Sequence, residues 1–81
     1  MNKEEIEKII FNSLKQIAPD TEPSKLSPDE NIRETLGIDS FDFLQFIVSL
    51  DEKLNLEIPE QDYGKITTLN SLIIYLTQKI K

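Results

Sequence analysis

An all-α fold, a four-helix bundle of three longer helices and one short helix, is predicted by three observations. The apolar residues are mainly 12 Ile and 10 Leu with a single Val, and such side chains pack between helices more readily than in a Thr- and Val-rich sheet. Three stretches repeat apolar residues at the period of a helix. The length of 81 residues allows one modest core, so residues 1–81 are expected to form a single domain.

The first long helix is expected over residues 3–17. Asn2 and Glu5 have the spacing of an N-cap and its capping partner. The helix should end at Ala18, because Pro19 cannot donate a helical hydrogen bond and excludes the residue before it from the α conformation. The apolar stripe of this helix comprises Ile6, Ile9, Ile10, Leu14 and Ile17.

A long connection over residues 19–39 separates the first two long helices. A structureless loop of this length is uncommon in a small domain, so we expect an ordered loop with a helical turn near residues 31–36. Gly37 is expected to take a positive φ at a reversal before the next helix. The apolar residues that pin this loop to the core are Leu26, Ile32, Leu36 and Ile38.

The second long helix should start at Asp39 or Ser40 and end near Lys53 or Leu54. At 100° per residue its apolar positions fall into two arcs separated by Asp51. The larger, inner arc comprises Phe43, Phe46, Ile47, Leu50 and Leu54 and is expected to face the core. The outer arc comprises Phe41, Leu44 and Val48, flanked by Gln45, Asp51 and Glu52. Either the outer arc is a partly exposed docking ridge, or a four-helix domain buries both arcs.

After an extended run over residues 56–58, the short helix is expected to begin at Pro59 and to end near Tyr63 and Gly64. The last long helix should be capped by Thr67 or Thr68. Its apolar stripe comprises Leu69, Leu72, Ile73, Leu76 and Ile80.

The composition excludes most enzyme chemistry. His and Cys are both absent, which removes Ser/His and Cys/His nucleophiles, zinc sites and disulfides, so any thiol must be supplied from outside the chain. No calcium-binding loop or glycine-rich nucleotide motif is present, and no metal site is expected. No apolar stretch is long enough to span a bilayer, and the acidic N-terminus does not resemble a targeting peptide. We therefore expect a soluble, cytoplasmic, monomeric protein that is not an enzyme.

The negative charge is confined to one segment. Residues 39–62 contain seven acids and one base, a balance of -6, whereas the other 57 residues contain eight of each sign and sum to zero. This balance argues against nucleic acid and anionic membranes as partners, since both attract basic surfaces. The segment is either a recognition surface for basic partners or a solvated face.

The run from Leu36 to Phe41 (LGIDSF) resembles the leucine, glycine, any residue, aspartate, serine, leucine signature of acyl carrier proteins. The runs at residues 50–54 (LDEKL), 57–60 (EIPE) and 65–69 (KITTL) follow at the spacing of that family. An Asp-Ser pair alone indicates only a helix cap. Because the similarity covers nearly the whole chain, the sequence is identified as a member of the family.

The resemblance implies that Ser40 receives a 4′-phosphopantetheine arm from coenzyme A through a magnesium-dependent phosphopantetheinyl transferase. Asp39 would then help to position the metal and substrate of the transferase, although it also suits a helix cap. Acyl groups would ride on the arm as thioesters and be delivered to basic-surfaced synthases, ligases and transferases. The residues that match the docking face of the family are Asp42, Gln45, Val48, Asp51 and Glu52, and the apolar ridge adds Phe41 and Leu44.

Three residues depart from the common family pattern. Phe41 replaces the usual leucine and Gln45 a usual glutamate, which favours a partner set different from that of the main fatty-acid carrier. Phe43 stands where the family usually has a small residue at the entrance to the interior. We expect its ring, beside Ile47 on the inner arc, to fill or reshape the acyl cavity.

A carrier for fatty acid, polyketide-like or other lipid synthesis is the leading interpretation. A peptidyl or D-alanyl carrier ranks lower because such carriers usually lack this dense acidic second helix. From a different class, a small acidic helical interaction domain would use Ser40 only as a cap.

Overall fold

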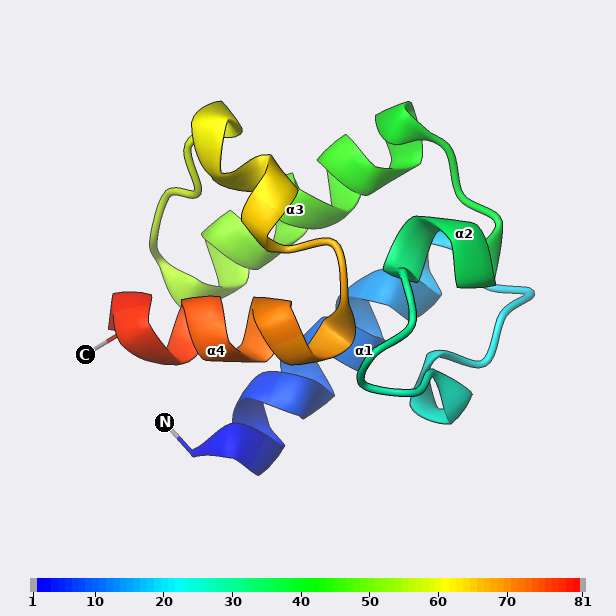
Figure 1. Ribbon diagram of the computed structural model, residues 1–81, viewed down its shortest axis with the longest axis horizontal. Coiled ribbons are helices and arrows are strands. Elements are labelled where there is room, and N and C mark those ends of the chain that lie inside the picture. The colour runs from blue at the N-terminus through cyan, green and yellow to red at the C-terminus, as the bar shows by residue number, and fades with distance from the viewer. Residues whose placement is uncertain (1, 81) are drawn as a thin grey trace.

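Three long helices frame the fold in the computed structural model, which describes residues 2–80 (Figure 1). They are α1 (Lys3–Ile17), α3 (Ser40–Leu54) and α4 (Leu69–Ile80). The connections carry three shorter helical segments, η1 (Pro23–Lys25), α2 (Ile32–Leu36) and η2 (Glu60–Lys65). Helix α1 packs against both α3 and α4, and no β-strand occurs within residues 2–80. The predicted all-α bundle is confirmed.

Local capping groups close the helices, and those at Asn2 and Gly37 were predicted. The Asn2 side chain accepts the Glu5 N–H at 2.9 Å, and the Glu5 carboxylate accepts the Asn2 N–H at 3.3 Å, which completes a capping box. Gly37 ends α2 with φ 68°, as expected, and Asn55 ends α3 with φ 53°. Both residues are in the left-handed conformation that commonly closes a helix.

The long connection is ordered, as predicted, because its backbone is bonded to the start of α4. The Ile32 N–H donates to the Thr67 carbonyl at 2.9 Å, and the Asn70 N–H donates to the Pro28 carbonyl at 2.8 Å. The short helix α2 occupies the predicted turn and is capped by the side chain of Asn31. These bonds hold α2 beside the start of α4, and the chain then runs from α2 to the first turn of α3 at the right of Figure 1.

Two predicted boundaries are corrected. Pro59 is extended, with ψ 148°, and precedes η2 instead of starting it, and η2 runs on to Lys65. Of the two candidate caps for α4, Thr68 is the one used, since its hydroxyl accepts the Ser71 N–H at 3.1 Å. No helix of the described residues is both long and apolar enough to cross a membrane.

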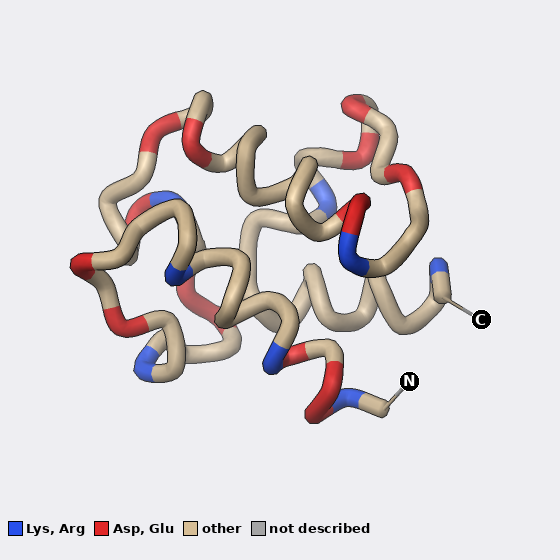
Figure 2. The backbone as a smooth tube through the Cα atoms, turned by 180° about the vertical axis from the view of Figure 1, so that it is seen from behind, with Lys and Arg blue, Asp and Glu red and all other residues tan. Residues whose placement is uncertain are grey.

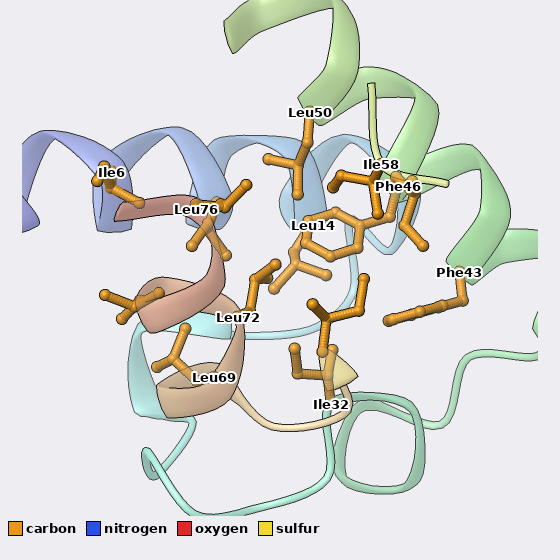
Figure 3. Packing of buried hydrophobic residues seen from close by; sticks show 14 of the residues in the cluster. Ile6, Leu14, Ile32, Phe43, Phe46, Leu50, Ile58, Leu69, Leu72 and Leu76 are labelled. Atoms are coloured by element: carbon orange, nitrogen blue, oxygen red, sulfur yellow. The ribbon is translucent and has the colours of Figure 1, made fainter. Parts of the chain in front are cut away.

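The core is filled from all three long helices and the connections (Figure 3). The buried apolar residues are Ile6, Ile10, Leu14, Leu26, Ile32, Ile38, Phe43, Phe46, Ile47, Leu50, Ile58, Ile66, Leu69, Leu72, Ile73 and Leu76. Five residues predicted to face the core are only partly buried, namely Ile9, Ile17, Leu36, Leu54 and Ile80.

One partly buried polar cluster between α1 and α3 was not predicted. Ser13 is fully buried and accepts hydrogen bonds from the Ser49 hydroxyl at 3.3 Å and the Lys53 ammonium at 3.1 Å. Lys53 also donates to the Gln16 side chain at 3.2 Å. The Ser13 and Ser49 hydroxyls are thus hydrogen-bonded where the two helices meet. This cluster fixes one side of α3 against α1.

Candidate functional site

Ser40 is the exposed first residue of α3. Asp39 precedes it in an extended conformation, and its carboxylate accepts the Asp42 N–H at 2.8 Å while its carbonyl accepts the Phe43 N–H at 3.0 Å. Asp39 is therefore a true N-cap. Because it satisfies only the later amides of the first turn, the N–H groups at the very start of α3 remain open to an anion. A negatively charged group on the Ser40 hydroxyl would be stabilised there.

A pocket of about 510 Å³ opens beside Ser40, between α2, the start of α3 and η2. We call it the Ser40 pocket. Its apolar and aromatic lining residues are Ile38, Phe43, Leu44 and Tyr63, and its polar and charged ones include Asn31, Arg33, Glu34 and Thr67. A smaller hollow lined by Ser40, Phe41, Leu44, Glu60 and Tyr63 continues it over the surface. The first atoms of a flexible arm on Ser40 would therefore lie beside the Ser40 pocket and this hollow.

Phe43 separates the Ser40 pocket from the core. It is only 7% exposed, and its ring lies against that of Phe46, with centroids 5.8 Å apart and planes at 51°. Figure 3 shows the ring projecting from α3 into the apolar cluster. Ile47, one turn further along, is completely buried and is not among the residues that line the pocket. The pocket thus ends at Phe43.

The outer arc of α3 is exposed, which rules out the alternative that both arcs are buried. Phe41, Leu44 and Val48 are 65%, 43% and 45% exposed, and we call them the α3 ridge. Gln45 and Glu52 beside them are also exposed. Three adjacent apolar side chains on one helix, continuous with the Ser40 pocket, form a surface suited to protein contact.

Figure 2 marks the acids along the backbone, and those of residues 39–62 differ in whether their carboxylates are bonded within the protein. Three have carboxylates bonded within the protein: Asp39 at the cap, Asp51 to the Ile58 N–H at 3.2 Å, and Asp62 to the Tyr75 hydroxyl at 2.6 Å. The side chains of the other four make no hydrogen bond or ion pair within residues 2–80; they are Asp42, Glu52, Glu57 and Glu60. The single base of the segment, Lys53, is turned to α1. A strongly negative surface therefore remains around α3.

The pKa values of Asp51 and Asp62 are shifted in opposite directions, for different physical reasons. Burial raises the pKa of Asp51 above its ordinary value, and the nearby Glu57 charge adds to this, although the Ile58 N–H opposes it. The Tyr75 hydroxyl lowers the pKa of Asp62, and Lys65, 3.3 Å away, lowers it further. Burial and the bond to Asp62 raise the pKa of Tyr75 to about 12. Because both pKa values are shifted in the folded state, the protonation of Asp51 and of Asp62 is linked to folding stability.

Three of the predicted site residues, Ser40, Phe43 and Leu44, line the Ser40 pocket, and its other lining residues were not predicted as site residues. Arg33 and Tyr63 line the Ser40 pocket from α2 and η2. The sequence contains one signal for the position of Arg33. The predicted turn near residues 31–36 and the reversal at Gly37 indicated that the chain before Ser40 folds back toward Ser40. Within residues 2–80 no group of three or more acids is arranged to hold a metal ion.

Comparison with known proteins identifies the class of the fold and site. The family model described as "Phosphopantetheine attachment site" matches residues 11–76. The chain is therefore a helical carrier domain whose cofactor is 4′-phosphopantetheine. It is 30% identical to an acyl carrier protein of Wolinella succinogenes, with 83% of this chain and 92% of that protein covered. It is 31% identical to an acyl carrier protein of Rubrobacter xylanophilus, with 96% and 95% covered.

A solved structure agrees with these relatives. The solution structure of a protein assigned as an acyl carrier protein of Anaplasma phagocytophilum superposes with a TM-score of 0.83 at 31% identity, covering 98% of this chain and 92% of that one. The chain belongs to the acyl carrier protein family. Members of this family are carriers and not enzymes, which agrees with the absence of His and Cys.

Proposed function

We propose that Ser40 is the attachment residue of the phosphopantetheine arm, and that the protein carries acyl intermediates for a fatty acid or specialised, polyketide-like lipid pathway. The observation that supports this most is the exposed Ser40 hydroxyl at the N-terminus of α3, beside a pocket, in a chain whose family bears the arm. The site fits the group, since the first amides of α3 are open to the phosphate charge.

In the attachment of phosphopantetheine, the role of this chain is to position the Ser40 hydroxyl. The Ser40 oxygen forms a bond to the β-phosphorus of coenzyme A, the pyrophosphate bond breaks, adenosine 3′,5′-bisphosphate leaves, and the hydroxyl proton passes to the transferase. Asp39 fixes the first turn of α3, and its second carboxylate oxygen, which has no hydrogen bond within residues 2–80, would be available to the metal of the transferase. When bound, the arm supplies the thiol that the sequence lacks and carries acyl groups as thioesters.

The α3 ridge and the free acids around it are the proposed docking face for enzymes with basic surfaces. Apolar contact by Phe41, Leu44 and Val48 would provide area, while Asp42 and Glu52 would steer and orient the encounter. Such rim charges accelerate association more than they slow dissociation, which suits a carrier that must be released. Phe41 and Gln45 support a pathway-specific set of partners over the general one.

Intact mass after incubation with coenzyme A, Mg²⁺ and a phosphopantetheinyl transferase tests the attachment site. Wild type should gain one phosphopantetheine, Ser40→Ala should gain none, and the matched control Ser24→Ala, which alters an exposed serine of the long connection, should behave as wild type. An adduct that persists in Ser40→Ala, or no adduct in any protein, would show that the proposal is wrong.

A further inference from the structure

The Ser40 pocket contains one cationic side chain, Arg33 of α2. It is the single arginine of the chain and is exposed. Although the chain has 15 acids, the Arg33 guanidinium makes no ion pair or side-chain hydrogen bond within residues 2–80. An unpaired guanidinium that faces the pocket of the modified serine has its full hydrogen-bonding capacity available to a ligand.

The phosphodiester of an arm on Ser40 would place a new negative charge beside Asp39 and Asp42, at the start of the segment that carries the net negative charge. The two nearest lysines in the sequence on the C-terminal side are engaged elsewhere. Lys53 donates to Ser13 and Gln16 on α1, and Lys65 lies 3.3 Å from Asp62. Arg33 is thus the cation placed to offset this charge, and the planar guanidinium can offer two N–H groups to two phosphate oxygens.

We propose that Arg33 is a positioning residue that binds the phosphodiester of the arm and holds its first portion in the Ser40 pocket. This inference rests on the proposed attachment at Ser40. The bound phosphate would lie between the start of α3 and Arg33, and the arm would leave past Ile38 and Tyr63, which also line the pocket. An enzyme that draws out the arm would have to replace this contact with a cation of its own.

The experiment uses NMR on the apo and holo forms of the full chain. Because the chain has one arginine, its Nε–H gives a single signal, which should shift when phosphopantetheine is added. The ³¹P resonance of the phosphodiester should shift in holo Arg33→Ala, shift less in Arg33→Lys, and remain unchanged in Lys25→Ala, which removes an exposed cation outside the pocket. Added salt should move the wild-type resonance toward that of Arg33→Ala, since exposed ion pairs are screened.

The outcomes separate this inference from the proposed function. If intact mass shows the holo form on Ser40, but the arginine signal does not move and Arg33→Ala has the wild-type ³¹P resonance, Arg33 does not bind the phosphate and only this inference is overturned. If no adduct forms, or if it forms without Ser40, both are overturned. Circular dichroism should show equal thermal unfolding of the Arg33 variants and Lys25→Ala, which excludes loss of folding as the cause.

Discussion

Asp51 offers a test that separates a structural role from a docking role in one side chain. It lies between the two arcs of α3, and its carboxylate accepts the Ile58 N–H at 3.2 Å, which ties the connection after α3 back to the helix. The neighbouring Glu52 is exposed and makes no such bond. Substitution of Asp51 by Ala and by Asn, with Glu52→Gln as the matched control, distinguishes the contribution of the hydrogen bond from that of the charge.

The hydrogen bond from the Ile58 N–H to Asp51 determines how much stability Asp51→Ala should lose. Asp51→Ala leaves the partly buried Ile58 N–H without its acceptor, which should lower the free energy of unfolding by about 1–2 kcal/mol. For a domain of this size that corresponds to a fall in Tm of roughly 4–16 °C, at about 4–8 °C per kcal/mol. Asp51→Asn keeps an acceptor oxygen for Ile58 and removes the charge, so it should be at least as stable as wild type at pH 7, by up to about 0.5 kcal/mol.

The pH dependence follows from the raised pKa of Asp51. The folded state holds the Asp51 proton more tightly than the unfolded chain, whose value is near 3.8, so the stabilising contribution of this group is fully present below 3.8. It is lost as the pH rises through the raised folded value. The advantage of Asp51→Asn over wild type should therefore be present at pH 7 and should disappear below pH 3.8, where Asp51 is also neutral.

Urea unfolding followed by circular dichroism at pH 7 and pH 3 measures both effects. Association rates with a basic partner enzyme at low and high salt then report the docking role, and Asp51→Asn and Glu52→Gln should each slow association at low salt without loss of stability. If Asp51→Asn is as destabilised at pH 7 as Asp51→Ala, the charge itself is required for folding and the reasoning is wrong.

Three further changes test other features. In Phe43→Leu and Phe43→Ala, octanoyl cargo should shift the core methyl NMR signals more than acetyl cargo does, unlike in wild type. The free energy of unfolding of Phe43→Ala should fall by about 3–5 kcal/mol, so Phe43→Leu keeps the test possible if Phe43→Ala does not fold. Equal responses in all three proteins would contradict a closing role. Tyr75→Phe should raise the pKa of Asp62, measured by carboxyl NMR titration. Because the pKa of Asp62 is lowered in the fold, its contribution is present above 3.8 and lost as the pH falls through the folded value, and this loss should shrink in the variant. Asn55→Ala should lower the free energy of unfolding, measured with urea, by about 1 kcal/mol, because residue 55 has φ 53°. Asn55→Gly should not lower it.

The helix ends and the two arcs of α3 were predictable because their causes are local. Asn2 with Glu5, Asp39, Gly37 and Thr68 act on residues within three or four positions, so their spacing in the sequence carries the information. The angular separation of apolar residues on α3 likewise depends only on the helical period. The same logic explains why Asp51 marked the boundary between the buried and exposed arcs.

The polar contacts between helices were not predictable from those patterns. Ser13 interrupts an apolar stripe, and nothing in the local sequence indicates that Ser49 and Lys53, 36 and 40 positions away, supply its partners. The place of Arg33 depends on the path of the long connection, which is fixed by backbone bonds to the start of α4. Such contacts require the tertiary arrangement and cannot be read from periodicity.

The contacts of α3 show how one helix could serve both the core and the proposed docking partner. Its inner arc is fixed by apolar packing, one flank by the Ser49 and Lys53 bonds to α1, and the other flank by the Asp51 bond to Ile58. The exposed α3 ridge between these flanks supports none of the internal bonds. A partner can therefore cover the ridge and approach Ser40 without disturbing the fold, and substitutions on the ridge should change docking far more than stability.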